Sequence, residues 1–172
     1  VNTRGVGVSG KIGKNLTFYS KFYENQAFFP DYLSGRIKKP RLNYSDNSTN
    51  GQLNIVPGQG IGKAFKDGGF DYGWAEGQVS YAPSKIFNFQ FGHGKNFIGS
   101  GYRSMILSDY AFNYPYFKIT TNVWKLQYVN LFCSFLDLNT RATYQGGYRK
   151  KYATFHYLTF FSKKHLELSV FE

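Results

Sequence analysis

Basic and aromatic side chains gather in stretches of this sequence that are rich in Gly and polar residues. Lys95, Tyr102 and Arg103 lie in the most distinctive stretch, and Arg149 lies at the end of a later one. Guanidinium and ammonium groups pair with carboxylates, and aromatic rings stack on flat apolar surfaces such as the faces of sugars. If these stretches share one end of the fold, the four residues are candidate ligands for an acidic polysaccharide.

Two other partners would use the same residue types. Single-stranded nucleic acid binds through cations and stacking rings, but the sequence favours a protein with no nucleic-acid partner. A solvated loop surface that faces the phosphates of lipopolysaccharide explains the positive charges at least as well as a polysaccharide site does. Charge alone does not choose among these anionic partners.

The residue types needed for catalysis or metal binding do not occur at useful spacings. Lys95 is followed by Asn96, whereas a phosphate-binding P-loop needs Ser or Thr at that point. The three histidines are far apart, and no carboxylates accompany them at the spacing of a metal site. Cys133 has no histidine partner that would activate its thiol. We therefore predict no catalytic residues, no metal and no cofactor, and a protein that is not an enzyme.

Composition excludes several classes of protein. The 172 residues carry a formal net charge of +11, 20% are aromatic, and there is one Cys. One Cys cannot form an internal disulfide, and so many aromatic residues are atypical of a disordered chain. No apolar run approaches the roughly 20 residues that a membrane-spanning helix needs. A transmembrane β-barrel is compatible with this sequence because its strands alternate apolar and polar residues.

The elements that must position the candidate site are strands. Phe occupies alternate positions in 86–92, and apolar residues likewise alternate with polar ones in 16–26. Successive side chains in a strand point to opposite faces, so each segment has one apolar and one polar face. Residues 124–137 carry apolar residues first on one face and then on the other, which predicts a β-bulge near Tyr128.

The connections between strands alternate between short and long. Turns of two to four residues join pairs of strands, whereas the stretches at about 27–69, 93–115 and 138–149 are long and polar. Compact soluble domains have connections of about 4–6 residues, while outer-membrane barrels have short turns at one rim and long loops at the other. We predict an all-β antiparallel meander of about eight strands, with 1–172 forming a fragment of one larger transmembrane β-barrel domain. A soluble β-sandwich with aromatic inner faces is the alternative.

The segment Gly101–Asp109, with its pattern Gly-Tyr-Arg-Ser-x-x-Leu-Ser-Asp, resembles a known family, and Asn113–Tyr116 and Gly10–Leu16 extend the likeness. It resembles the capsule-assembly (Wzi-type) outer-membrane barrels, and most closely their Bacteroidetes relatives described as gliding-motility outer-membrane proteins. The resemblance implies a large barrel in the outer membrane that attaches or organises surface polysaccharide as a lectin. It supplies no ligand residues, so the four candidates above depend on their chemistry alone.

The sequence thus predicts a non-enzymatic protein of the bacterial outer membrane that binds or organises capsular polysaccharide, with a link to gliding motility through its nearest relatives. Its expected partners are outer-membrane lipid and lipopolysaccharide, an acidic surface polysaccharide, and other outer-membrane proteins. The alternative function is that of a soluble extracellular β-sandwich module that binds carbohydrate.

Overall fold

A computed structural model describes residues 1–172 except 39–40, 43–48, 51–53, 100, 142–147 and 164–165. The described elements are, in chain order, β1 (Asn2–Ile12), β2 (Leu16–Phe28), α1 (Asp31–Ile37), β3 (Arg41–Leu42), β4 (Thr49–Asn50), β5 (Asn54–Val56), β6 (Gly60–Phe65), β7 (Gly69–Tyr81), β8 (Phe87–Gly94), β9 (Tyr114–Val123), β10 (Leu126–Arg141), β11 (Tyr148–Lys163) and β12 (Leu166–Phe171). The predicted all-β class is confirmed.

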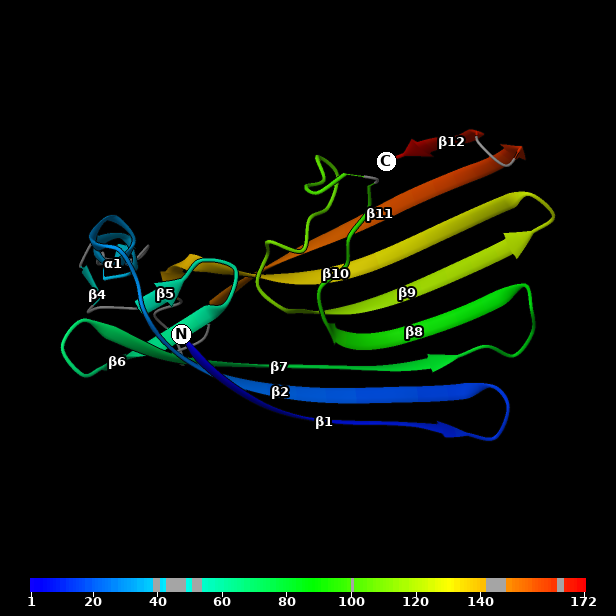
Figure 1. The fold of residues 1–172 in the computed structure, drawn as a ribbon. Coiled ribbons are helices and arrows are strands. Elements are labelled where there is room, and N and C mark those ends of the chain that lie inside the picture. Colours follow the sequence, from blue (N-terminus) through cyan, green and yellow to red (C-terminus); the bar gives the residue numbers. More distant parts are fainter. Residues whose placement is uncertain (39–40, 43–48, 51–53, 100, 142–147, 164–165) are drawn as a thin grey trace.

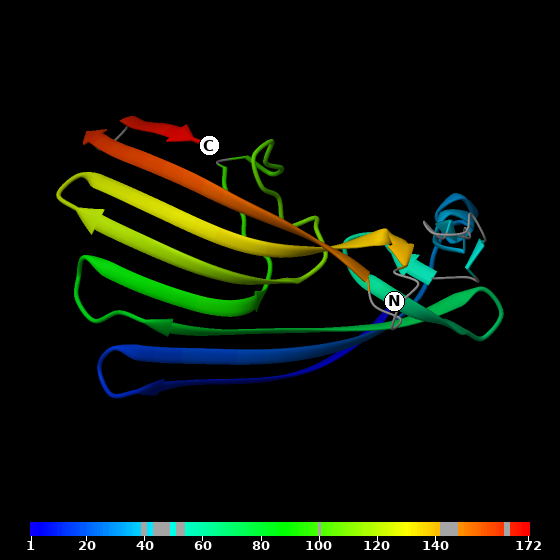
Figure 2. The ribbon, with the colours of Figure 1, turned by 180° about the vertical axis from the view of Figure 1, so that it is seen from behind.

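Within the described residues, the strands form one antiparallel sheet that does not close on itself. Its main path runs β1-β2-β7-β8-β9-β10-β11-β12, with β6 paired to β7 and β5 paired to β6. Strands β1 and β12 lie at its two edges, and β3 and β4 form a separate two-stranded ladder. Seen from either side, the main path is a single layer of strands (Figures 1 and 2). The predicted antiparallel meander is present.

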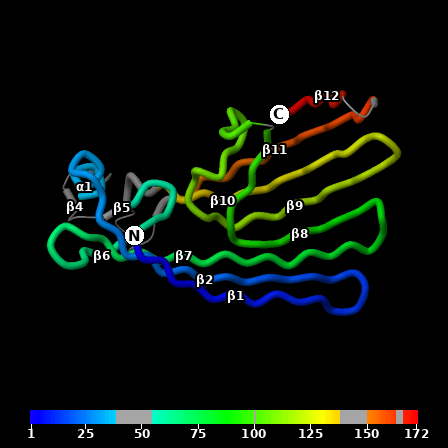
Figure 3. The backbone as a smooth tube through the Cα atoms, in the orientation of Figure 1, coloured from blue at the N-terminus to red at the C-terminus, as the bar shows by residue number. Residues whose placement is uncertain are grey.

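Short and long connections lie at opposite ends of the strands. The turns that join β1 to β2, β7 to β8 and β9 to β10 are together at one end, and α1, β5 and β6 are at the other (Figure 3). Stretch 27–69, expected as one long loop, contains α1 and the β5–β6 hairpin in its described part. Ile37 and Val56 from this stretch pack with Phe70 and Ala27 in a small buried cluster. The apolar residues of this stretch are too few to show a helical or strand periodicity in the sequence, and they nevertheless pack together in the folded protein.

The two faces of the sheet differ in chemistry. We call the face crossed by residues 95–113 the loop face and the opposite one the bare face. One row of residues aligned across seven neighbouring strands of the bare face is Gly10, Phe18, Val79, Phe91, Phe117, Phe132 and Thr154. The adjoining row on the loop face is Ser9, Tyr19, Gln78, Gly92, Tyr116, Cys133 and Ala153. The alternation read from the sequence thus separates an apolar face from a mixed, more polar one.

Strand β10 runs without the predicted bulge. Its pairing with β9 and β11 is continuous from Leu126 to Cys133, and the first register shift on the β11 side comes only after Asp137. The prediction of a bulge near Tyr128 was therefore wrong. Both faces of β10 carry apolar residues. On its loop face Leu131 and Cys133 are buried, and on its bare face Leu126 and Phe132 are exposed. A strand covered on one side and apolar on the other needs no irregularity to explain its pattern.

Candidate functional site

Residues 95–113, the loop between β8 and β9, fold back over the sheet. Leu107 of this loop is buried with Tyr114, Leu131 and Cys133, and Ile98 packs against the same cluster. Ile98 and Leu107 form an isolated antiparallel bridge. The Ser104 hydroxyl donates to the Ile98 carbonyl and accepts from the amides of Ile106 and Leu107, at 3.0 and 3.2 Å. The loop therefore packs against the apolar residues on the loop face of β10 and β11.

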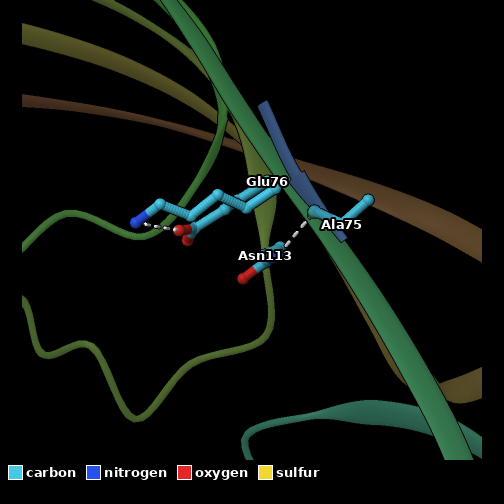
Figure 4. Close-up of polar contacts among 4 residues, drawn as sticks. Ala75, Glu76 and Asn113 are labelled. Atoms are coloured by element: carbon cyan, nitrogen blue, oxygen red, sulfur yellow. Dashed lines mark hydrogen bonds and ion pairs between the residues drawn. The ribbon is translucent and has the colours of Figure 1, made fainter. Parts of the chain in front are cut away.

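The loop is also fastened to a seam in the sheet. Strand β8 pairs with residues 77–81 of β7 and β6 pairs with 69–72, so no described strand covers residues 73–76 on that edge. Asn113 supplies one missing partner, because its Nδ2 donates to the Ala75 carbonyl at 2.8 Å (Figure 4). The neighbouring Glu76 carboxylate lies 3.6 Å from the Lys21 ammonium. At the seam, the Asn113 side chain thus supplies a hydrogen bond to the Ala75 carbonyl where no strand does, while Lys21 and Glu76 pair across the intact β2–β7 ladder.

Lys95 points into the protein instead of toward solvent. Its ammonium donates to the Gly58 carbonyl at 2.8 Å and lies 5.8 Å from the centre of the Trp74 ring. Burial lowers the pKa of Lys95, and the nearby Asp109 and Glu76 carboxylates oppose that effect. Lys95 therefore joins the loop to the β5–β6 turn, which restricts its access to an external ligand.

The β5–β6 turn approaches the loop closely. Gly60 has a φ of 116°, and a Cβ there would clash with the Phe112 ring. No side chain fits in that space, and an L-residue disfavours that backbone conformation. The loop is therefore held between the sheet on one side and the β5–β6 turn on another.

Tyr102 and Arg103 lie at the exposed tip of the loop. The Tyr102 side chain is 83% exposed, and its hydroxyl is 2.9 Å from that of Tyr110. Its hydrogen bond to Tyr110 raises the pKa of Tyr102. The Arg103 guanidinium lies 5.2 Å from the centre of the Tyr110 ring. These three residues offer a cation and two ring faces to solvent, the chemistry predicted for a sugar-binding surface.

Arg149 belongs to a different element. It lies on β11, opposite Asp137 in register, and its side chain is outside the described part of the structure. The four predicted ligands therefore comprise an exposed pair, a lysine used internally, and an arginine located by its backbone position alone.

A cleft of about 370 Å³ lies between the loop and strands β9 to β12, and the sequence analysis did not identify it. Its polar lining residues are Asn96, Lys118, Thr120, Gln127, Tyr157 and Glu167. Lys118 is half-buried, and its ammonium donates to the Asn96 Oδ1 at 3.2 Å. The available sequence signal is a single charged residue in the middle of the strand 116–121. Lys118 does not stand out as a site residue in the sequence, because only the structure shows that a loop partly covers this face of the strand.

Comparisons with protein-family models, curated proteins and solved structures found no match to this chain. In the part of the chain that the structure describes, His, Cys, Asp and Glu side chains form no group of three that could hold a metal ion. A search of the same residues for helices found none with the length and apolar character needed to span a bilayer.

Proposed function

We propose that this protein is part of an outer-membrane β-barrel that binds or organises an acidic surface polysaccharide. The observation that carries the proposal is the bare face, where large apolar side chains are exposed on strand after strand. They are Val6, Val8, Phe22, Val79, Phe87, Phe91, Phe117, Leu126, Phe132, Leu158, Leu168 and Val170. Phe91 is 66% exposed although it lies on a central strand.

Such a surface is unsuited to water. Soluble monomers rarely expose a contiguous apolar patch of more than a few hundred Å², and this one extends across the sheet from β1 to β12. A barrel wall has this distribution, with apolar side chains toward lipid and mixed or polar ones toward the interior. In the middle of the bare face, His156 Nδ1 lies 2.9 Å from the Tyr128 hydroxyl and 2.7 Å from Asn130 Oδ1. An Nδ1–H on His156 would donate to Asn130 Oδ1, so some polar groups of the bare face pair with one another, which lowers the cost of contact with hydrocarbon.

The free edges of the sheet support the same proposal. Strands β1 and β12 each have one edge that pairs with no other described strand. An uncovered edge promotes association with other chains, and closure of a barrel removes it. The tip of the loop, where Tyr102 and Arg103 are exposed, is then the surface that meets polysaccharide.

Lipid contact is tested with the full chain reconstituted in vesicles that contain brominated lipid. In a Cys133→Ala background, a fluorophore is attached to Phe91→Cys on the bare face or to Ser9→Cys on the loop face. We expect strong quenching by brominated lipid at position 91 and weak quenching at position 9. Equal quenching, or a folded monomer that forms without detergent or lipid, contradicts the membrane location and favours a soluble sandwich.

Ligand binding is tested on the same reconstituted protein with polyglucuronate and with dextran, its uncharged counterpart. Binding of polyglucuronate that weakens with salt, together with weaker binding of dextran, supports recognition of an acidic polysaccharide. Equal binding of both polymers, or of neither, contradicts it.

A further inference from the structure

The cleft beneath the loop contains the cation Lys118, which forms an ion pair with no carboxylate of the described residues. Among the described residues, the ion pairs join Lys21 to Glu76 and Lys151 to Asp137, and neither includes Lys118. Among the described residues, the hydrogen-bond partner of Lys118 is the Asn96 side-chain oxygen, and its ammonium also lies 5.9 Å from the centre of the Tyr116 ring. A half-buried ammonium with one neutral hydrogen-bond partner is poorly compensated, so an anion in the cleft would be bound favourably.

Asn96 is incompletely satisfied as well. Its backbone amide donates to the Tyr114 hydroxyl at 3.0 Å, and its Oδ1 accepts from Lys118. The Asn96 Nδ2 is buried with no hydrogen-bond partner among the described residues. Buried donors in native proteins usually have a partner, so an unpaired one beside a cleft indicates a missing acceptor.

The rest of the lining fits a sugar ring. Thr120, Gln127 and Tyr157 bring hydroxyl and amide groups, and Val129 and Ile98 bring apolar surface. The volume of about 370 Å³ lies at the lower end of the range for small-molecule pockets, roughly 300–1,000 Å³. Polar groups that fix orientation within a partly apolar cleft are typical of a site for a small, hydroxyl-rich ligand.

We propose that this cleft holds one acidic sugar residue, a uronate, with its carboxylate on Lys118 and its hydroxyls toward Thr120, Gln127 and Tyr157. The inference rests on the proposed function and specifies where the protein binds the polysaccharide or a fragment of it. It moves the main ligand contact from the exposed Arg103 to a lysine on the loop face of β9.

Glu167 is the one carboxylate in the lining, and it does not oppose this assignment. It lies on β12, three strand positions from Lys118 on β9. Neighbouring strands are about 4.8 Å apart, so the two elements are separated by roughly 14 Å. Glu167 therefore lines the cleft from another strand than Lys118, and its carboxylate can accept hydrogen bonds from sugar hydroxyls while the uronate carboxylate pairs with Lys118.

The test measures the affinity of glucuronate and of glucose for the full chain in vesicles, with Lys118→Gln as the main variant. The matched control is Lys63→Gln, which removes the same charge at an exposed lysine on β6, outside the cleft. We expect Lys118→Gln to weaken glucuronate binding at least about tenfold, Lys63→Gln to leave it unchanged, and glucose to bind much more weakly than glucuronate. Thr120→Trp, which keeps Lys118 but fills the cleft, should also abolish binding.

Unchanged glucuronate affinity in both Lys118→Gln and Thr120→Trp overturns the assignment. If Arg103→Gln loses binding instead, the ligand lies at the loop tip, and the proposed function survives without this cleft. Failure of the wild-type chain to bind glucuronate also overturns the inference. In that case, lipid quenching of a fluorophore at position 91 shows separately whether the proposed membrane location is also wrong.

Discussion

The two faces of this sheet are made by the same strands, and yet their apolar residues differ in distribution and in burial. On the loop face, the buried apolar residues lie under segments of the chain that cover them: Leu131 is completely buried under residues 95–113, and Phe70 is buried against α1 and β5. On the bare face, every strand of the main path carries exposed apolar residues. The loop face is thus organised around segments of the chain that cover it, whereas no described segment covers the exposed apolar residues of the bare face. Apolar side chains alone therefore do not indicate a protein core, since their distribution across neighbouring strands separates a covered face from an exposed one.

The largest effect is expected where the loop face is best packed. Leu131→Ala should lower the free energy of unfolding by about 2–5 kcal/mol, because it removes buried contacts and leaves a cavity under the loop. Leu126→Ala, on the bare face of the same strand and 40% exposed, should cost less than about 1 kcal/mol. Urea unfolding in vesicles measures both. Equal losses would mean that Leu126 is packed against protein.

A charge on either face sharpens the comparison. Phe89→Arg should destabilise the membrane-inserted protein by roughly 2–4 kcal/mol, as for arginine near the bilayer midplane on a barrel's lipid face. Asn88→Arg, one residue away on the loop face, loses a hydrogen bond from Ser80 and should cost about 1 kcal/mol. Insertion efficiency and urea titration in vesicles report on the pair. Normal insertion and stability of Phe89→Arg would show that lipid does not cover this face.

The contact between the β5–β6 turn and the loop is tested with alanine at two glycines. Gly60→Ala should destabilise by roughly 1–3 kcal/mol through its φ of 116° and its clash with Phe112. Gly68→Ala, at a φ of 87° but with open space around it, should cost only about 1 kcal/mol. Thermal unfolding of the two variants isolates the clash, and a smaller loss at Gly60 would place Phe112 elsewhere.

The smallest effect concerns pH. Because the pKa of Lys95 is lowered in the folded protein, the unfolded chain binds that proton more tightly. The contribution of Lys95 to stability should therefore rise as the pH increases toward the ordinary lysine range. Lys95→Met should remove that part of the pH dependence, as judged by the difference between its unfolding curves and those of the wild type. A difference that falls with rising pH would contradict the burial of this ammonium.

The sequence was sufficient for the parts of the fold that depend on alternation over one strand. It predicted the strands around Phe89 and Phe18, the short turns and the position of the loop after His93. It missed the β5–β6 hairpin, whose strands are short and whose Gly60 acts through a contact with the distant Phe112. It also misjudged β10, because whether Leu131 is covered depends on a loop folding back from elsewhere in the chain.

The candidate site was predictable only in its exposed half. Tyr102 and Arg103 are prominent because they are clustered in a Gly-rich stretch, and the structure places both at the loop tip. The sequence treated Lys95 as equivalent to them, although its ammonium is bonded to Gly58. Lys118 and Asn96 are 22 residues apart in sequence and meet only after the loop folds over β9. Spacing along the chain carries no sign of such a meeting.

The seam at residues 73–76 has a mechanical consequence. At these residues β7 is laddered to β2 alone, because β6 has ended and β8 has not begun, so β7 should twist more readily there than where strands pair with both of its edges. Rotation there would carry the β5–β6 hairpin, with Gly58, relative to the rest of the sheet. Because Lys95 is bonded to Gly58, that tilt would pull on the start of the loop, and the aperture of the cleft would follow the orientation of the hairpin.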